Sequence, residues 1–227
     1  MFFWDPTMVV LIPALILAFY AQIKVKSTYN KYMKVNNSRG ITGKQAAMEL
    51  LRINGISDVS VEEVGGSLSD HYDPRIKKVR LSSENYRNAS LASVSIAAHE
   101  VGHAIQDATG YMPLQLRHSI LPATNIGSWL AFPLFFIGFF FRTPFLMDLG
   151  IVFFGGVLVF HLVTLPVEFN ASSRAMKQLE SHGLLTTGEA VGAKKVLSAA
   201  ALTYVAATAM AALQIIRLLV LRNAVDD

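Results

Sequence analysis

Two histidines and a glutamate stand close together in the segment His99-Glu100-Val101-Gly102-His103. Residues four apart on a helix face the same side, so the imidazoles of His99 and His103 can bind one tetrahedral zinc ion. Glu100 is rotated by about 100° from His99 around the helix axis and can reach a water on the metal without competing for the metal. Zinc lowers the pKa of such a water, and a carboxylate can take its proton and pass it to a leaving amine. The spacing therefore predicts peptide-bond hydrolysis by a zinc-activated water, with Glu100 as the general base.

The composition predicts that the elements around this motif include membrane helices. The 227 residues are 52% hydrophobic and have a mean hydropathy of +0.41, which allows one moderate soluble domain and several spans. The net charge is +4, but the basic residues flank apolar stretches and form no continuous stripe, so we predict no nucleic-acid partner. The chain has no cysteine, which excludes disulfides and thiolate ligands, so zinc must be held by His, Asp or Glu.

Four segments are apolar enough to span a bilayer, which needs about 20 residues. They are residues 7–25, 119–141, 145–167 and 196–221, and Arg142-Thr143-Pro144 joins the second and third in a helical hairpin. The fourth is rich in alanine and carries Gln214 and Arg217 near its end, so it can either cross the membrane or lie against the other helices.

Basic residues predict the orientation of these spans, because Lys and Arg gather in cytoplasmic loops. They are abundant after the first span and after the third, and rare at the opposite ends. The residues concerned are Lys24, Lys26, Lys31, Lys34 and Arg39, then Arg174, Lys177, Lys194 and Lys195. Both of these loops are therefore predicted to face the cytoplasm.

The soluble segment between the first two spans is predicted to be α+β. Thr42 and Gln45 match a capping box, and the apolar periodicity that follows ends at Asn54-Gly55, which is typical of a short helix. Residues 58–64 and 77–81 read as strands of a small hairpin or meander. Residues 90–107 have no helix breaker and are predicted to form the helix of the two histidines.

A catalytic zinc site needs a third protein ligand, without which the motif would be a chance match on an ordinary amphipathic helix. Gln106 and Thr109 stand where a metzincin has glycine and histidine, which excludes that class. An intramembrane protease of the site-2 type would use an aspartate, but Asp148 is predicted at the outer end of the third span, about 30 Å from the cytoplasmic side. Glu168 is predicted at the inner end and is the favoured ligand, the alternative being a surface carboxylate paired with Lys or Arg.

Three motifs together are similar to the YugP-like neutral zinc metallopeptidases of bacteria, relatives of the HtpX-type membrane gluzincins. The motifs are HEVGHAIQ at 99–106, DHYDP at 70–74 and PVEFNASSRA at 166–175. The resemblance implies one zinc ion held by His99, His103 and Glu168, with Glu100 as general base, in an active site at the cytoplasmic face of the bacterial inner membrane. HtpX-type enzymes usually have an aspartate where Ser172 stands, so Asn170, Asp107 or another group is expected to orient a ligand histidine.

The sequence thus predicts a mostly α, multi-span membrane protein with a small zincin-like α+β segment. The expected division is an anchor at 1–26, a catalytic segment at 27–118, a hairpin at 119–167, a ligand-bearing cytoplasmic helix at 168–195 and a last helix at 196–227. The expected function is a zinc metalloendopeptidase (HExxH, gluzincin type) whose partners are a polypeptide substrate and the lipid bilayer. The alternatives are a zinc-binding membrane adaptor without catalysis and a site-2-type intramembrane protease.

Overall fold

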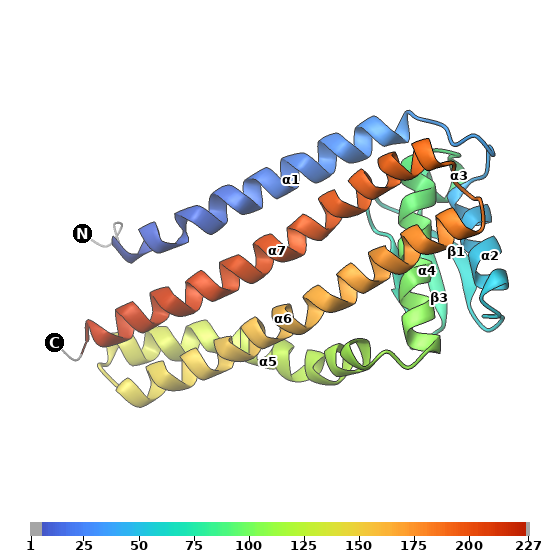
Figure 1. Ribbon diagram of the computed structural model, residues 1–227. Helices are drawn as coiled ribbons and strands as arrows, with labels where there is room; N and C mark the ends of the chain where they lie inside the picture. Colours follow the sequence, from blue (N-terminus) through green and yellow to red (C-terminus); the bar gives the residue numbers. More distant parts are fainter. Residues whose placement is uncertain (1–5, 226–227) are drawn as a thin grey trace. The chain divides into compact units, whose positions relative to one another are not determined.

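The computed structural model describes residues 6–225 and is dominated by long helices (Figure 1). In chain order the elements are η1 (Pro6–Leu11, a 3-10 helix), α1 (Ile12–Met33), α2 (Gly43–Ile53), β1 (Ser60–Val64), β2 (His71–Asp73), β3 (Lys78–Ser82), α3 (Ser83–Arg87), α4 (Leu91–Ala108), α5 (Met112–Phe140), α6 (Pro144–Ser181) and α7 (Thr187–Asn223).

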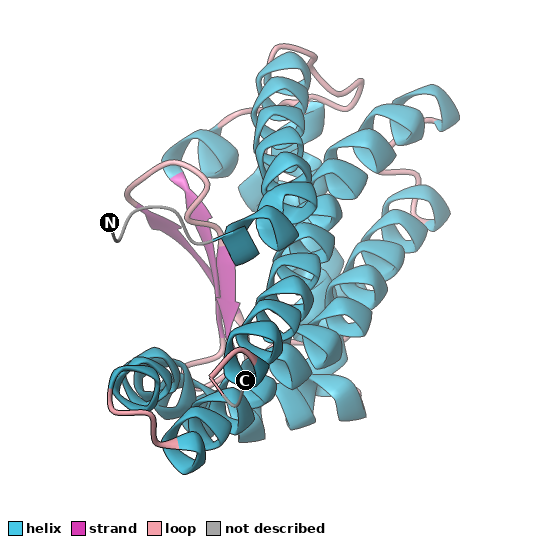
Figure 2. Ribbon diagram, turned by 90° about the vertical axis from the view of Figure 1, so that its left-hand side faces the viewer, coloured by secondary structure: helices cyan, strands magenta, loops and turns pink. Residues whose placement is uncertain are grey.

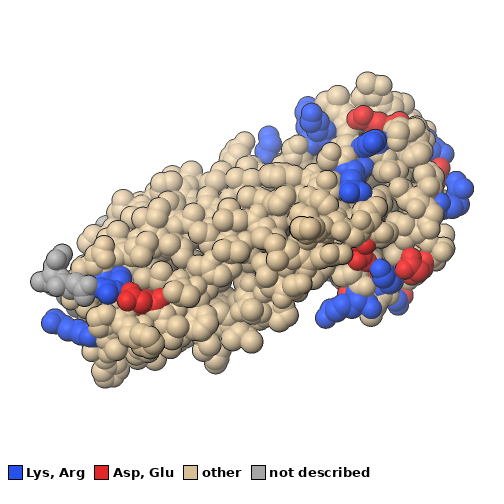
Figure 3. All heavy atoms as spheres, turned by 60° about the horizontal axis from the view of Figure 1, so that its bottom comes forward, with Lys and Arg blue, Asp and Glu red and all other residues tan. Residues whose placement is uncertain are grey.

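Four of the described helices are long and apolar enough to cross a membrane. They run over Pro6–Met33, Met112–Phe140, Pro144–Ser181 and Thr187–Asn223, and each contains one of the predicted spans. Figure 3 shows a broad surface without Lys, Arg, Asp or Glu on the face drawn, as lipid contact requires. These helices and the small sheet confirm the prediction of a mostly α membrane protein with a small α+β segment.

The described chain divides into two compact units. The helical unit contains residues 6–22, 115–165 and 203–225, and the sheet-containing unit contains residues 23–114 and 166–202. The helices α1, α5, α6 and α7 contribute residues to both units. The two histidines of the HEVGH motif and Glu168 all belong to the sheet-containing unit.

The helical unit is held by apolar packing between α5, α6 and α7. Phe135 of α5, Met147 of α6 and Leu218 of α7 are fully buried in one cluster. The backbones of α5 and α6 approach closely, since a Cβ added at Gly150 would lie 2.7 Å from the carbonyl oxygen of Ala131. The helix α5 ends at Phe140 and α6 begins at Pro144, so the predicted helical hairpin is present.

In the sheet-containing unit, several local signals of the sequence act as predicted. The amide of Gln45 donates to Thr42 Oγ1 over 3.2 Å and the amide of Thr42 donates to Gln45 Oε1 over 2.8 Å, which forms the capping box of α2. This helix ends at Ile53, followed by Gly55 in the left-handed region with φ of 68°. The predicted strands 58–64 and 77–81 correspond to β1 and β3.

The order of the strands differs from the prediction. The strands form one sheet (Figure 2). Its order is β1-β3-β2, with β1 parallel to β3 and β2 antiparallel to β3. The prediction that these two strands form a hairpin or meander was therefore wrong. The connection from Gly65 to Lys77 is long enough to return the chain to the starting end of the sheet, and on its way it adds β2 at the far edge of β3.

One face of this sheet is buried by helices. Val79 and Leu81 are two residues apart on β3, so their side chains point to the same face of the sheet. Both are fully buried, so this face points into the core. They belong to one apolar cluster with Leu50 of α2 and Val101 of α4. The cluster continues to Leu179 of α6, so α4 is packed between the sheet and the end of α6 that belongs to this unit.

A glycine allows α6 to approach α4 beside the histidines. A Cβ added at Gly102 would lie 2.6 Å from the carbonyl oxygen of Ala171, closer than two such atoms can pack. Gly102 stands one residue before His103, and Ala171 stands three after Glu168. The absence of a side chain at Gly102 thus permits the two helices to bring these residues together.

We predict that Gly102→Ala destabilises the protein, although alanine is the better helix former. The added methyl must push against backbone, which costs about 1–3 kcal/mol. The measurement is the midpoint of thermal unfolding in detergent. Gly188→Ala in α7 is the control, because a Cβ there meets nothing within 4 Å, and it should unfold at or slightly above the wild-type temperature. Equal midpoints for the two variants would contradict the close approach.

Candidate metal and catalytic site

The helix α4 begins and ends where its sequence provides the signals. The hydroxyl of Ser90 accepts a hydrogen bond from the amide of Ser93 over 3.0 Å and caps the first turn. The helix ends at Ala108, two residues before Gly110, which has a φ of 63°. Between these ends the helix is nearly all buried, and it presents His99 and His103 on the same side with ring centroids 4.8 Å apart.

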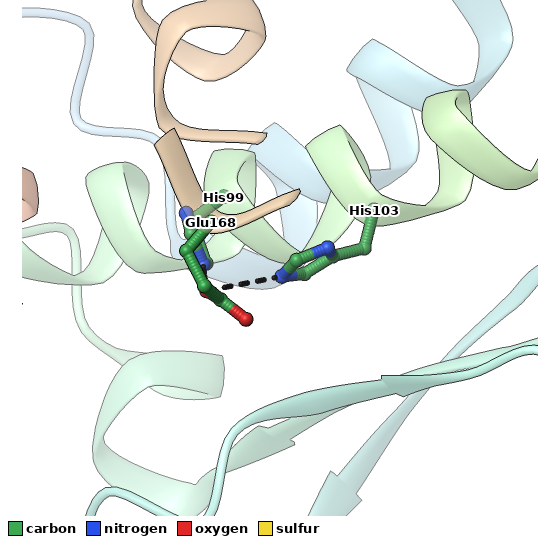
Figure 4. Close-up of side chains that lie close together, drawn as sticks. All are labelled: His99, His103 and Glu168. Atoms are coloured by element: carbon green, nitrogen blue, oxygen red, sulfur yellow. Dashed lines mark hydrogen bonds and ion pairs between the residues drawn. The ribbon is translucent and has the colours of Figure 1, made fainter. Parts of the chain in front are cut away.

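Glu168 of α6 points its carboxylate at both imidazoles (Figure 4). Glu168 Oε2 lies 3.3 Å from His99 Nε2 and 3.6 Å from His103 Nε2. In a tetrahedral zinc site, with bonds of about 2.0–2.2 Å, ligand atoms lie about 3.4 Å from each other. The spacing and the chemistry of these two nitrogens and one oxygen therefore fit a zinc ion.

Electrostatics also favours a cation at this place. The side chain of Glu168 is only 2% exposed, and an isolated carboxylate so buried would be costly. Burial lowers the pKa of His103, but the contact with Glu168 and its charge raise that pKa by more, so the net shift is upward. The cluster thus stabilises a positive charge, which a divalent cation can supply in place of a proton.

Each histidine is oriented through its other ring nitrogen. His99 Nδ1 lies 3.1 Å from Ser172 Oγ, and His103 Nδ1 lies 3.0 Å from Gln106 Oε1. When each Nε2 binds a metal, each Nδ1 carries the proton and donates it to these oxygens. Ser172 thus contacts the histidine from the position where the resembling enzymes have aspartate.

Gln106 was not among the orienting residues expected from the sequence. Its amide nitrogen donates to the carbonyl oxygen of Val167 over 2.8 Å and to Asn170 Oδ1 over 3.0 Å. Arg174 Nε donates to the same Asn170 oxygen over 2.7 Å. Asn170 therefore reaches His103 only through Gln106. The signal in the sequence is that Gln106 follows His103 by three residues and so shares its helix face.

Asp107, the other residue considered for that role, has different partners. Asp107 Oδ2 accepts hydrogen bonds from Tyr72 Oη over 2.7 Å and from Lys77 Nζ over 2.6 Å. These contacts join the end of α4 to β2 and to the turn before β3. Asp107 thus connects the sheet to α4, and neither of these two hydrogen bonds involves a histidine of the motif.

Glu100 lies beside the three converging residues and remains available for chemistry. Its side chain is buried, and within residues 6–225 its carboxylate has no hydrogen-bond partner. Burial raises the pKa of Glu100 above its ordinary value, although the nearby imidazoles act in the opposite direction. A buried carboxylate without a partner is an effective proton acceptor for a group brought in by a substrate.

Asp148, the alternative third ligand, lies in the helical unit and is paired there. Arg222 Nε donates to Asp148 Oδ1 over 2.8 Å. Within the described residues, the group of His, Asp and Glu side chains close enough to hold a metal consists of His99, His103 and Glu168.

Comparison with known proteins shows the family of this chain. Residues 7–223 match the model of a family described as "Putative neutral zinc metallopeptidase". This chain belongs to that family. A relative from Bacillus subtilis (strain 168), named "Putative membrane protease YugP", is 49% identical over 206 residues, which cover 91% of this chain and 92% of the relative. No solved structure matches the chain.

Membership of a zinc metallopeptidase family confirms the resemblance inferred from the three motifs. It supports zinc as the metal, a polypeptide as the substrate and a membrane as the location, in keeping with the four long apolar helices.

We predict that Gln106→Ala lowers the affinity for zinc by about 10–100-fold, since His103 loses the group that orients its ring. The affinity can be measured in detergent by competition with a chelator. Gln178→Ala is the matched control, because Gln178 also exchanges amide hydrogen bonds with an asparagine, Asn54, within the same unit. Equal zinc affinity in the two variants would show that Gln106 does not orient the ligand.

Proposed function

We propose that the chain is a membrane-anchored zinc metalloendopeptidase of the gluzincin type, with an HExxH motif whose metal ligands are His99, His103 and Glu168. One observation supports this assignment most. Three donor atoms from two different helices converge at 3.3 and 3.6 Å, next to the unpartnered carboxylate of Glu100. A structural zinc site would usually be closed by a fourth protein ligand and would have no use for such a carboxylate.

Zinc bound at this place supplies Lewis acidity, which activates a water and polarises the peptide carbonyl. Glu100 acts as the general base: its carboxylate accepts a proton from the attacking water and then delivers it to the amine that leaves as the peptide bond breaks. Its burial favours this role, because a pKa raised above the ordinary value makes the carboxylate a stronger base. Gln106 and Ser172 hold the imidazoles so that each Nε2 faces Glu168.

The site is proposed to face the cytoplasm from the bacterial inner membrane. The basic residues that follow the first and third spans support this orientation. In this arrangement residues 1–26 anchor the chain, 27–118 form the catalytic segment, 119–167 form the membrane hairpin, 168–195 carry the third ligand and 196–227 form the last membrane helix. The substrates are then polypeptides that are unfolded or associated with the membrane.

Two other functions are less well supported. A zinc-binding adaptor without catalysis would not need Glu100 to be free of partners. An intramembrane protease would need Asp148 at the metal, whereas Asp148 is engaged by Arg222.

We predict that Glu100→Gln lowers kcat/KM on unfolded casein by about 10²–10⁴-fold, the usual contribution of a general base. Zinc content should remain at the wild-type level, because the substituted group is not a ligand. Activity is measured on purified protein in detergent, and bound zinc is measured by atomic absorption. Glu180→Gln, an exposed position of α6, is the control and should keep full activity. Full zinc with unchanged activity in Glu100→Gln would exclude the proposed mechanism.

We also predict that Glu168→Ala loses bound zinc on dialysis, since two imidazoles alone hold the ion weakly. Asp148→Ala should retain it. The readout is the zinc-to-protein ratio after dialysis against a mild chelator, with thermal unfolding as the test of folding. Loss of zinc from Asp148→Ala together with retention in Glu168→Ala would favour the intramembrane protease.

A further inference from the structure

A groove of about 660 Å³ lies between α1 and α7, within the sheet-containing unit. Each helix lines it with one face. On α1 the lining residues are Lys24, Ser27, Thr28 and Lys31, spaced by three and four residues, and Tyr32 adjoins them. On α7 the same spacing places Val191, Lys194, Lys195, Ser198, Ala199 and Leu202 along the groove.

The groove is strongly basic. Four lysines line it, and within residues 6–225 none of them has a carboxylate within 4 Å. Lys31 Nζ lies over the ring of Tyr32, 5.6 Å from its centroid. Ser27, Thr28 and Ser198 also line the groove, and the hydroxyl of Ser27 donates to the carbonyl oxygen of Lys24 over 3.2 Å. Ammonium groups without an acidic partner are donors suited to a phosphate.

The groove also lies where the apolar stretches of two spans end. On α1, Lys24 is the first charged residue after the described apolar run that begins at Pro6. On α7, Lys194 and Lys195 directly precede the apolar run that includes Leu202. A ligand that extends from this groove toward the spans therefore meets ammonium groups along the groove and apolar side chains beyond Lys24 and Leu202. A free phosphate matches only the first of these surfaces, whereas a phospholipid matches both.

The wall behind the groove is firmly packed. Tyr29 of α1, Ala92 of α4 and Val196 of α7 are buried in one cluster. A Cβ at Gly192 would lie 2.8 Å from the ring of Tyr32, so α7 approaches α1 closely at this level. The lysines therefore extend from a fixed surface that holds them near one another although like charges repel.

We propose that this groove binds an anionic phospholipid, with the headgroup phosphate held by Lys24, Lys31, Lys194 and Lys195 and an acyl chain lying toward Leu202. Four cationic side chains without acidic partners favour a lipid with net negative charge over a zwitterionic one. The site shares no residue with the proposed zinc centre, so its occupancy does not depend on catalysis.

The test is native mass spectrometry of the full-length protein in detergent, titrated with dioleoyl phosphatidylglycerol or dioleoyl phosphatidylcholine. Wild type should bind the phosphatidylglycerol at least tenfold more tightly. The double variants Lys24→Gln/Lys31→Gln and Lys194→Gln/Lys195→Gln should each weaken that binding about tenfold or more. The matched control is Lys26→Gln/Lys34→Gln, which removes two exposed charges, one from α1 and one directly after it, but none from the groove, and should bind within about twofold of wild type.

Competition with inorganic phosphate distinguishes the two sources of the anion. Millimolar phosphate should leave the lipid bound, because it offers no acyl chain. Displacement by phosphate would overturn the lipid assignment, as would equal binding of the two lipids. An equal loss of binding in the control variant would show attraction to general surface charge and would also overturn the proposal.

Discussion

The carboxylate of Glu168 is buried between two imidazoles, and much of the sheet-containing unit serves to keep it there. Taking a carboxylate out of water is costly unless a positive charge and hydrogen-bond donors replace the solvent. His99 and His103 provide these groups from α4, at 3.3 and 3.6 Å from one oxygen. The buried carboxylate of Glu168 favours positive charge beside it. This preference draws the imidazoles of α4 toward α6, and it also favours a divalent cation between them.

This convergence requires α4 and α6 to lie closer than ordinary helices do. Gly102 removes the side chain that would meet the backbone at Ala171. The network of Gln106 then ties the same pair of helices together, through the carbonyl group of Val167 and the amide of Asn170. One glycine and one glutamine of the HEVGHAIQ segment therefore determine how accurately Glu168 is placed.

The helix α6 contributes residues to both units. With 38 residues it measures about 57 Å, well beyond the roughly 30 Å of a bilayer's hydrocarbon core. Part of it contributes to the helical unit and the part from Pro166 onward contributes to the sheet-containing unit. Glu168 lies two residues after Pro166, so the sequence of one helix includes both the carboxylate of the site and an apolar stretch long enough to span a membrane.

Local signals allowed the sequence alone to predict the helices α2 and α4, the four candidate spans and the family, because caps, apolar runs and i, i+4 spacing act within a few residues. The pairing of β1 with β3 escaped prediction, since register depends on where a long connection returns the chain. The roles of Ser172 and Gln106 were likewise decided only by tertiary structure. Ser172 meets His99 Nδ1 from α6, so that contact depends on the packing of α4 against α6. Gln106 shares a helix face with His103, but its amide is also held by Val167 and Asn170 of α6.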